Sequence, residues 1–258
     1  MILSDFHLHT NFCDGKNDPE SIVIEAISRG MKKLGFSGHS HTPFDAGANM
    51  SIENTAKYRA EIQRLKEKYR GQIKILCGTE QDYYSDMSTE GYDYVIGSVH
   101  YLHINGQYIS TDNTPEIFAD LIHECNDDPY DMAERYFALV SDVVNKTGAD
   151  IIGHFDLITK FSEKYTFFDE DNERYIKAAL SAVDALIGTG KPFEINTGAI
   201  SRGWRTTPYP SRRILEHIAS RGGRVILSSD AHDKRNLMYK FNECEELARS
   251  LGLEIVEL

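Results

Sequence analysis

The chain has 258 residues, of which 41% are hydrophobic, with a formal charge of −12 and four cysteines. This length suits two small domains or one α/β barrel, and the negative charge disfavours proteins that bind the phosphate backbone of nucleic acids. No apolar run is long enough to span a bilayer and no signal-peptide pattern is present, so we expect a cytoplasmic protein. The cysteines form no CxxC pair, which excludes zinc-finger and thioredoxin-type sites and favours reduced thiols.

Short β-rich runs alternate with amphipathic segments along the chain. The first helix is expected from Asp18, which can cap it, through Pro19 to Gly30 at its C-terminal end. Six further helices are expected at about 54–69, 115–125, 130–147, 171–187, 211–222 and 237–251. Seven strands are expected at 2–8, 32–39, 73–80, 93–100, 149–155, 191–197 and 224–230. The alternation predicts an α/β fold with a parallel sheet, closed into a single barrel domain over residues 1–258, one unit short of the eight-fold barrel.

Metal-binding side chains stand at the ends of six of the seven predicted strands. In chain order they are His7 and His9, His39 and His41, Glu80, His100, His154, and Asp230 and His232. The predicted sixth strand ends at Asn196 instead. The C-terminal strand ends of an α/β barrel build one active site, so we expect these side chains to converge. Imidazole with carboxylate suits zinc, iron or manganese, and adjacent ions that share a bridging carboxylate suit phosphoryl transfer.

Each pattern also has an ordinary structural explanation. The HLH stretch alone favours a partly exposed strand, Asp14 is typical of a turn, and Glu80 is compatible with a charge at a helix entry. The coincidence at six strand ends favours a shared site over these separate explanations. Asp5 stays open between a role in orienting an imidazole and a place in the barrel core. Three histidines are assigned to no site, one in a hairpin and two on helices: His103, His123 and His217.

Basic residues follow the predicted strands five and six, at the same end of the barrel as the metal-binding residues. Lys160 lies in the loop after the fifth strand, and Arg202 and Arg205 lie in the segment GAISRGWRTTPYPS after the sixth. They are candidates for holding an anion, although each one singly is equally compatible with a solvated surface.

Seven motifs, in order over nearly the whole chain, resemble the PHP (polymerase and histidinol phosphatase) family. They are DFHLHTNFCDG, LGFSGHS, CGTEQDY, DYVIGSVHY, IIGHFDLI, FEINTGA and LSSDAH. GSVHY and GHFDLI look most like the stand-alone histidinol-phosphate phosphatases of that family. The resemblance implies a distorted (β/α)7 TIM-like barrel with three divalent metal ions, which could be zinc, iron or manganese.

Nine residues match the metal ligands of the family. The resemblance implies a first ion at His7, His9, Glu80 and Asp230, a second at Glu80, His100 and His154, and a third at Asp14, His39 and His232. Glu80, Asp230 and His232 are expected to act in catalysis, and Lys160, Arg202 and Arg205 to bind phosphate. The chain departs from the family at Gly38, where many members have aspartate, and at Ser201, where members often have a basic residue.

The activity implied by the resemblance is hydrolysis of L-histidinol phosphate to L-histidinol and phosphate, in histidine biosynthesis. A metal-bridging hydroxide would attack phosphorus in line, with cationic side chains on the equatorial oxygens. The expected partner is a small phosphate monoester, with no nucleic acid and no membrane, and the oligomeric state stays open. Two alternatives are a PHP-type phosphoesterase that acts on nucleotides or short oligonucleotides, and a metal-binding protein without turnover.

Overall fold

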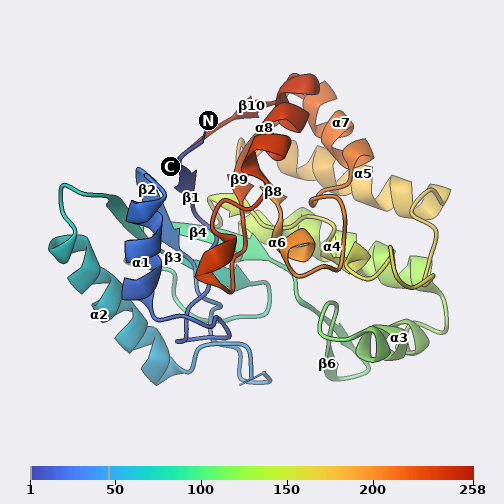
Figure 1. Ribbon diagram of the computed structural model, residues 1–258. Coiled ribbons are helices and arrows are strands. Elements are labelled where there is room, and N and C mark those ends of the chain that lie inside the picture. The colour runs from blue at the N-terminus through green and yellow to red at the C-terminus, as the bar shows by residue number, and fades with distance from the viewer. Residues whose placement is uncertain (1, 46) are drawn as a thin grey trace.

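A computed structural model describes residues 2–45 and 47–258. One parallel sheet of eight strands has the order β1-β2-β3-β4-β7-β8-β9-β10. Its strands are β1 (Ser4–Asp5), β2 (Lys33–Phe36), β3 (Lys74–Asp82), β4 (Tyr94–Ser98), β7 (Ile151–Ile152), β8 (Phe193–Asn196), β9 (Arg224–Ser228) and β10 (Glu254–Ile255) (Figure 1). A separate antiparallel hairpin pairs β5 (Tyr101–Ile104) with β6 (Gln107–Ser110).

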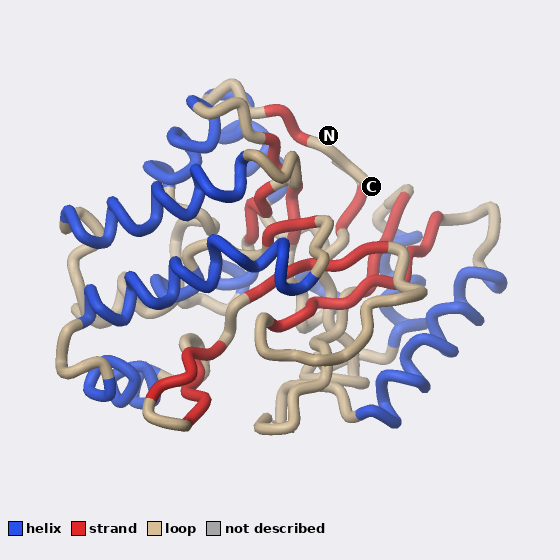
Figure 2. Tube along the Cα trace, turned by 180° about the vertical axis from the view of Figure 1, so that it is seen from behind, coloured by secondary structure: helices blue, strands red, loops and turns tan. Residues whose placement is uncertain are grey.

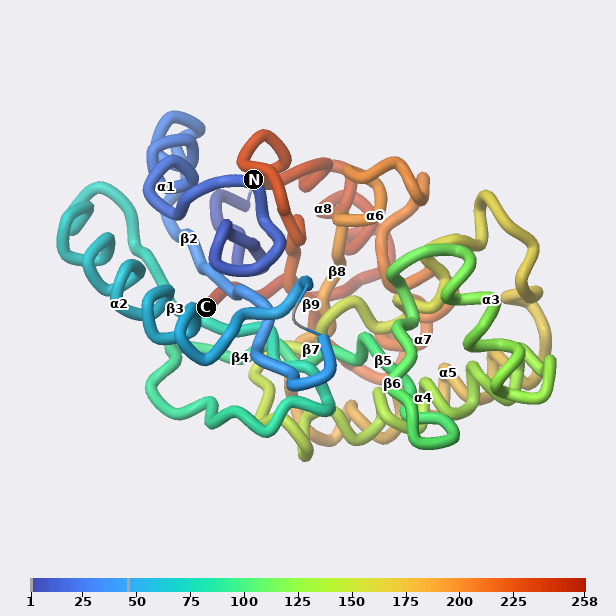
Figure 3. Tube along the Cα trace, turned by 90° about the horizontal axis from the view of Figure 1, so that it is seen from below, coloured from blue at the N-terminus to red at the C-terminus, as the bar shows by residue number. Residues whose placement is uncertain are grey.

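Helices lie on both sides of the strands, as Figures 2 and 3 show from behind and from below. The helices are α1 (Pro19–Ser28), α2 (Ile52–Lys68), α3 (Pro115–Glu124), α4 (Pro129–Thr147), α5 (Glu173–Ile187), α6 (Gly198–Ser201), α7 (Arg212–Ser220) and α8 (Phe241–Ser250). Asp18 caps α1 as expected, because its side chain accepts a hydrogen bond from the Ser21 N–H. Within the described residues, no helix has the length and apolar character that crossing a membrane requires.

The predicted elements are present, with small additions. Each of the seven expected strands overlaps an observed one, with β3 extending two residues past the expected range, and each of the seven expected helices overlaps an observed helix. The sequence prediction missed the four-residue α6 and the short β10, which pairs with the start of β9. The mixed α/β fold with a parallel sheet is therefore confirmed, whereas β10 brings the strand count of the sheet to eight.

The sheet curves until its first strand approaches the end of β9. Leu8 and Ala231 form a parallel bridge, and the N–H of His9 donates to the carbonyl of Ala231 over 3.0 Å. Asp5 is fully buried here and accepts hydrogen bonds from the N–H groups of Ser229 at 3.1 Å and Met238 at 3.0 Å. Asp5 thus joins two chain segments and does not contact an imidazole ring in the described structure. This closure places the segments after β1 and β9 side by side.

Tyr94 occupies the interior between the first strands and depends on two glycines. Its hydroxyl donates to the carbonyls of Phe6 and Phe36, at 2.5 and 3.0 Å. The ring lies against the backbone of Gly35 and Gly78, where an added Cβ atom would come within 2.4 Å of the tyrosine side chain. A buried ring packed this closely has to shift when a methyl group is added, so both positions favour glycine.

We predict that Gly78→Ala lowers the free energy of unfolding by about 1–3 kcal/mol, because the new methyl group displaces Tyr94 from a packed site. Urea denaturation, followed by circular dichroism, measures the change. The control is Gly188→Ala, where nothing lies within 4 Å of the added atom and we expect a change of less than about 0.5 kcal/mol. Equal stability of the two variants would contradict the packing argument.

Candidate metal centre

The carboxylate of Glu80, near the end of β3, lies at the centre of a ring of imidazoles. Its Oε2 atom is 2.8 Å from His39 Nδ1 and 3.2 Å from His7 Nε2. Its Oε1 atom is 2.8 Å from His154 Nε2 and 3.1 Å from His100 Nε2. These four histidines follow four different strands, β1, β2, β4 and β7. The ends of the sheet therefore converge on one carboxylate.

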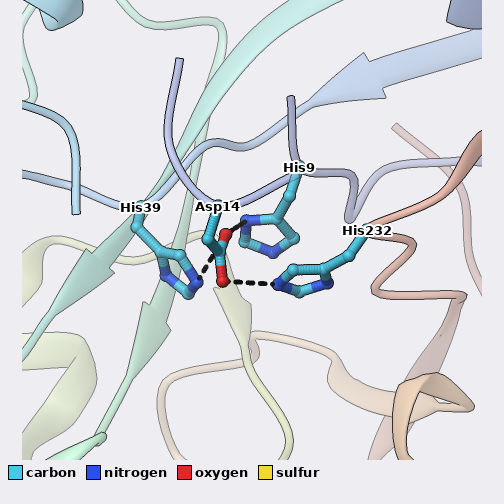
Figure 4. A group of neighbouring side chains, drawn as sticks. All are labelled: His9, Asp14, His39 and His232. Carbon is cyan, nitrogen blue, oxygen red and sulfur yellow. Dashed lines mark hydrogen bonds and ion pairs between the residues drawn. The ribbon is translucent and has the colours of Figure 1, made fainter. Parts of the chain in front are cut away.

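A second group gathers around Asp14, in the turn after β1 (Figure 4). Asp14 Oδ2 is 3.0 Å from His232 Nε2, and Asp14 Oδ1 is 3.6 Å from His39 Nε2 and 3.7 Å from His9 Nδ1. One ligand atom from each of the four residues lies within 4.8 Å of the others. From the sequence alone, Asp14 was typical of a turn residue. In the structure its side chain points into the cluster.

A third group joins the ends of β1 and β9. Asp230 Oδ1 is 3.2 Å from His9 Nε2 and 3.7 Å from His7 Nε2. Asp230 has a φ of +49°, which is uncommon for a residue with a side chain, so its backbone is strained at the point where it aims this carboxylate. The β1–β9 closure described above makes this group possible.

The nine residues expected from the sequence as metal ligands all lie in this one cluster. Eight of them form three compact groups, in each of which the ligand atoms lie within 4.8 Å of one another, and His154 joins through Glu80. The compact groups are His9 with Asp14, His39 and His232; His7 with His9 and Asp230; and His39 with Glu80 and His100. His41 does not belong to it, because its Nδ1 atom lies 3.0 Å from the carbonyl of Met50. His103 lies in the β5–β6 hairpin and His123 and His217 on α3 and α7, outside the cluster, as expected.

Three buried atoms of the cluster fit a role in binding cations. His7 Nε2, His9 Nε2 and Glu80 Oε2 are buried and make no hydrogen bond within the described structure. A buried polar atom without a partner costs about 1–3 kcal/mol, so three together in one place need an explanation. All three face other ligand-type atoms at 2.8–3.7 Å. Nitrogen and oxygen donors in this arrangement suit divalent zinc, iron or manganese.

The protonation of His9 and Glu80 also suits cation binding. Burial, together with the neighbouring His232 and His39, lowers the pKa of His9 to about 3, so this imidazole is neutral with a free lone pair. Burial alone would raise the pKa of Glu80, but the surrounding His7, His39 and His100 hold it well below its usual value. A neutral imidazole and an ionised carboxylate are the forms that bind metal ions.

Two carboxylates that the sequence analysis missed hold the far sides of the imidazoles. Glu194 on β8 lies 2.7 Å from His7 Nδ1 and also accepts from the N–H of His154 at 2.9 Å. Asp82 lies 3.2 Å from His100 Nδ1 and accepts from the N–H of the same residue at 3.1 Å. Such partners set the tautomer and orientation of a ligating histidine. The sequence contained an indication of Glu194, since an acidic residue inside the apolar run FEIN indicates a buried role.

A cavity of about 250 Å³ opens onto the cluster, and two positively charged side chains, Lys160 and Arg202, lie in its wall. Arg202 donates to Asp230 Oδ2 at 2.9 Å, and Lys160 is 3.0 Å from Asp112 Oδ2. Arg205 does not line this cavity; it donates to the carbonyl of Thr159 at 2.7 Å, next to Lys160. Two of the three basic candidates therefore face the cavity, and the third supports the loop that carries one of them.

A model of the PHP domain matches residues 5–198, which is more than half of the chain. The chain therefore belongs to the PHP domain family, in agreement with the resemblance in its motifs. The match covers the parallel sheet, the convergent histidines and the carboxylates described above. Only the strands and candidate ligands after residue 198 lie outside it.

The curated relatives of the chain are histidinol-phosphatases. It is 31% identical to a probable histidinol-phosphatase of Schizosaccharomyces pombe, covering 96% of this chain and 86% of the relative. It is also 31% identical to a probable histidinol-phosphatase of Deinococcus radiodurans, covering 97% and 94%. The histidinol-phosphatase of Bacillus subtilis is 25% identical, covering 92% and 96%. The similarity thus extends beyond the matched domain to nearly the whole chain.

Two solved structures share the fold. A putative histidinol phosphatase of Listeria monocytogenes superimposes with a TM-score of 0.80 at 19% identity, covering 93% of this chain and 99% of the other. Histidinol phosphate phosphatase of Lactococcus lactis, solved in complex with zinc, L-histidinol and phosphate, gives 0.76 at 22% identity, covering 98% and 95%.

We predict that Glu194→Gln weakens metal binding about 10- to 100-fold, because His7 loses the carboxylate that orients it. Titration of the metal-free protein with zinc against a competing chelator measures the affinity. The matched control is Glu246→Gln, the same change at an exposed position of α8, which we expect to leave the affinity unchanged. If Glu194→Gln binds zinc as tightly as the control, Glu194 has no orienting role.

Proposed function

We propose that the chain is a metal-dependent phosphomonoesterase that hydrolyses L-histidinol phosphate to L-histidinol and phosphate. The observation that carries the proposal is the position of the His, Asp and Glu cluster at a cavity whose wall also contains Lys160 and Arg202. Metal-binding groups beside two cations suit a dianionic phosphate. The curated relatives, named histidinol-phosphatases and aligned over nearly the whole chain, support the choice of substrate.

We further propose that the cluster holds three divalent ions, of zinc, iron or manganese. The proposed ligands are His7, His9, Glu80 and Asp230 for the first ion, Glu80, His100 and His154 for the second, and Asp14, His39 and His232 for the third. Support comes from His9 and His39, which each belong to two of the compact groups, as expected where neighbouring ions lie close together. The zinc in the Lactococcus lactis structure supports the choice of metal.

The chemistry divides between the ions and the side chains. Bound divalent ions would make hydroxide available from water near neutral pH and offset charge on the phosphate oxygens. Arg202 donates to Asp230 and, over 2.9 Å, to His232 Nδ1, so it fixes two of the three residues that we propose to act in catalysis, the third being Glu80. Lys160 is the second proposed phosphate-binding cation, and Arg205 would act by positioning the Lys160 loop.

The two alternative functions are less well supported. Outside the cluster the cavity wall contains two carboxylates, Asp45 and Asp112, which disfavour a polyanionic oligonucleotide. A metal-storage protein has no need for Lys160 and Arg202 beside its ions. We also propose that residues 1–258 form one PHP-type domain of the distorted (β/α)7 type, because the β1–β9 contacts join the two ends of the chain.

We predict that Glu80→Ala loses bound metal and lowers kcat/KM on L-histidinol phosphate by at least about 100-fold, because its carboxylate contacts four imidazoles of the site. Phosphate release and the metal content of the same preparation are measured together, with circular dichroism to verify the fold. Full turnover by metal-depleted Glu80→Ala protein would overturn the proposed mechanism.

We predict that Lys160→Met lowers kcat/KM about 100-fold while the metal content stays the same, because Lys160 belongs to none of the metal-binding groups. The control is Lys177→Met, which removes the same charge from an exposed position of α5 and is expected to keep full activity. Equal kinetics of the two variants would exclude Lys160 from phosphate binding.

A further inference from the structure

Among the described residues, one carboxylate in the cavity wall has no positively charged partner. Five carboxylates line the cavity. Asp14, Glu80 and Asp230 belong to the metal-binding cluster, and Asp112 is paired with Lys160. Asp45, in the segment between β2 and α2, belongs to none of the metal-binding groups and forms no ion pair within residues 2–45 and 47–258. A negative charge thus faces the space in which we place the substrate.

Hydrogen bonds hold the Asp45 carboxylate in place and leave part of it available. Its Oδ2 atom accepts from the Tyr101 hydroxyl at 2.7 Å, and its Oδ1 atom accepts from the N–H groups of Gly47 at 2.8 Å and Ala48 at 3.3 Å. A carboxylate has about four acceptor positions, so one on Oδ2 stays free.

The segment that carries Asp45 is fixed against the β5–β6 hairpin. The Phe44 ring stacks on Tyr108 with 3.9 Å between centroids and meets the edge of Tyr101 at 4.9 Å. Asn49 donates to Thr42 at 2.5 Å and to the Tyr101 hydroxyl at 3.4 Å. These contacts order Asp45 before any ligand arrives, which reduces the entropic cost of binding.

Tyr101 also connects this wall to the metal-binding cluster. It follows His100 in the chain, and the two rings meet edge to face at 6.3 Å. Arg202, Lys160 and the ions proposed for the cluster would provide positive charge for a phosphate, whereas Asp45, hydrogen-bonded to Tyr101, provides negative charge in the same wall. A cavity with opposite charges in its wall suits a small molecule that carries a phosphate and a cation a few bonds apart.

We propose that Asp45, positioned by Tyr101, binds the ammonium group of the substrate and thereby selects amino-alcohol phosphates. The inference rests on the proposed histidinol-phosphatase function. In L-histidinol phosphate the amine is on the carbon next to the phosphate-bearing CH₂ group, so a bound phosphate keeps it close to the metal-binding end. An alkyl ammonium is fully charged at neutral pH, whereas an imidazole with a pKa of about 6.5 is mostly neutral. The amine is therefore the better partner for Asp45.

The test compares three substrates on metal-loaded wild-type and Asp45→Asn protein. L-Histidinol phosphate has both groups, 3-(imidazol-4-yl)propyl phosphate lacks the amine, and L-phenylalaninol phosphate keeps the amine and lacks the imidazole. We expect Asp45→Asn to lower kcat/KM about 10- to 100-fold for the two amine-bearing substrates, the scale of one charged hydrogen bond, mainly through KM. The wild-type preference for L-histidinol phosphate over the deaminated compound should shrink by the same factor.

Two further variants separate this role from general effects. Tyr101→Phe removes the hydrogen bond that positions Asp45, and we expect a smaller loss confined to the same two substrates. Asp86→Asn changes the net charge equally at an exposed position after β3, outside the cavity lining, and we expect no change in preference. Metal content is measured for every preparation, so that a loss of ions is not mistaken for a loss of recognition.

The possible results point in different directions. Equal loss on all three substrates, or no loss on any of them, overturns the ammonium site. A loss that spares L-phenylalaninol phosphate also overturns it, since Asp45 would then contact the imidazole. If the wild type does not hydrolyse L-histidinol phosphate, the proposed function fails separately. The ammonium site is then judged on 2-aminoethyl phosphate against propyl phosphate, where it requires a preference that Asp45→Asn removes.

Discussion

The buried negative charge of Glu80 is the constraint on which the site depends. The residue is only 1% exposed, and a buried carboxylate is costly unless positive charge or hydrogen-bond donors surround it. Four imidazole nitrogens at 2.8–3.2 Å meet that need, and each comes from the end of a different strand. The strands β1, β2, β4 and β7 must therefore end at one level around β3. The contacts of Glu80 thus depend on the register of the sheet.

The closure between β1 and β9 brings residues from the C-terminal part of the chain into the same site. The Leu8–Ala231 bridge and the Asp5 hydrogen bonds to Ser229 and Met238 join segments more than 200 positions apart. Without them, Asp230 would not reach His7 and His9. Because burial raises the pKa of Asp5 to about 6, this carboxylate is held in a place that disfavours its charge. The contacts that close the sheet thus also hold Asp230 beside His7 and His9.

The sequence predicted the inner part of the site better than its surroundings, for a physical reason. Histidines at strand ends are visible because all carboxyl ends of parallel strands meet at one edge, whatever the details of packing. Glu194 and Asp82 were missed because their role depends on which face of a strand they occupy and which imidazole nitrogen they meet. β10 was missed because a two-residue pairing has little periodicity. The sequence could not predict that Asp45 contacts Tyr101 or that Arg205 contacts Thr159, because loop conformation decides both contacts.

The positively charged side chains in the cavity wall explain how an acidic protein can bind an anionic substrate. A chain with a formal charge of −12 repels phosphate at long range, yet screening limits this repulsion to about 10 Å in salt. Inside the cavity the nearest charges dominate, and its wall contains Arg202 and Lys160 as well as Asp45, which accepts a hydrogen bond from Tyr101. A substrate with its own cation gains from both kinds of charge in this wall, whereas a simple phosphate ester gains only from the positive side chains and has no partner for the carboxylate of Asp45. The acidic wall therefore acts as a filter, and the charge pattern of the substrate is selected by the same arrangement that offsets the charge of the protein.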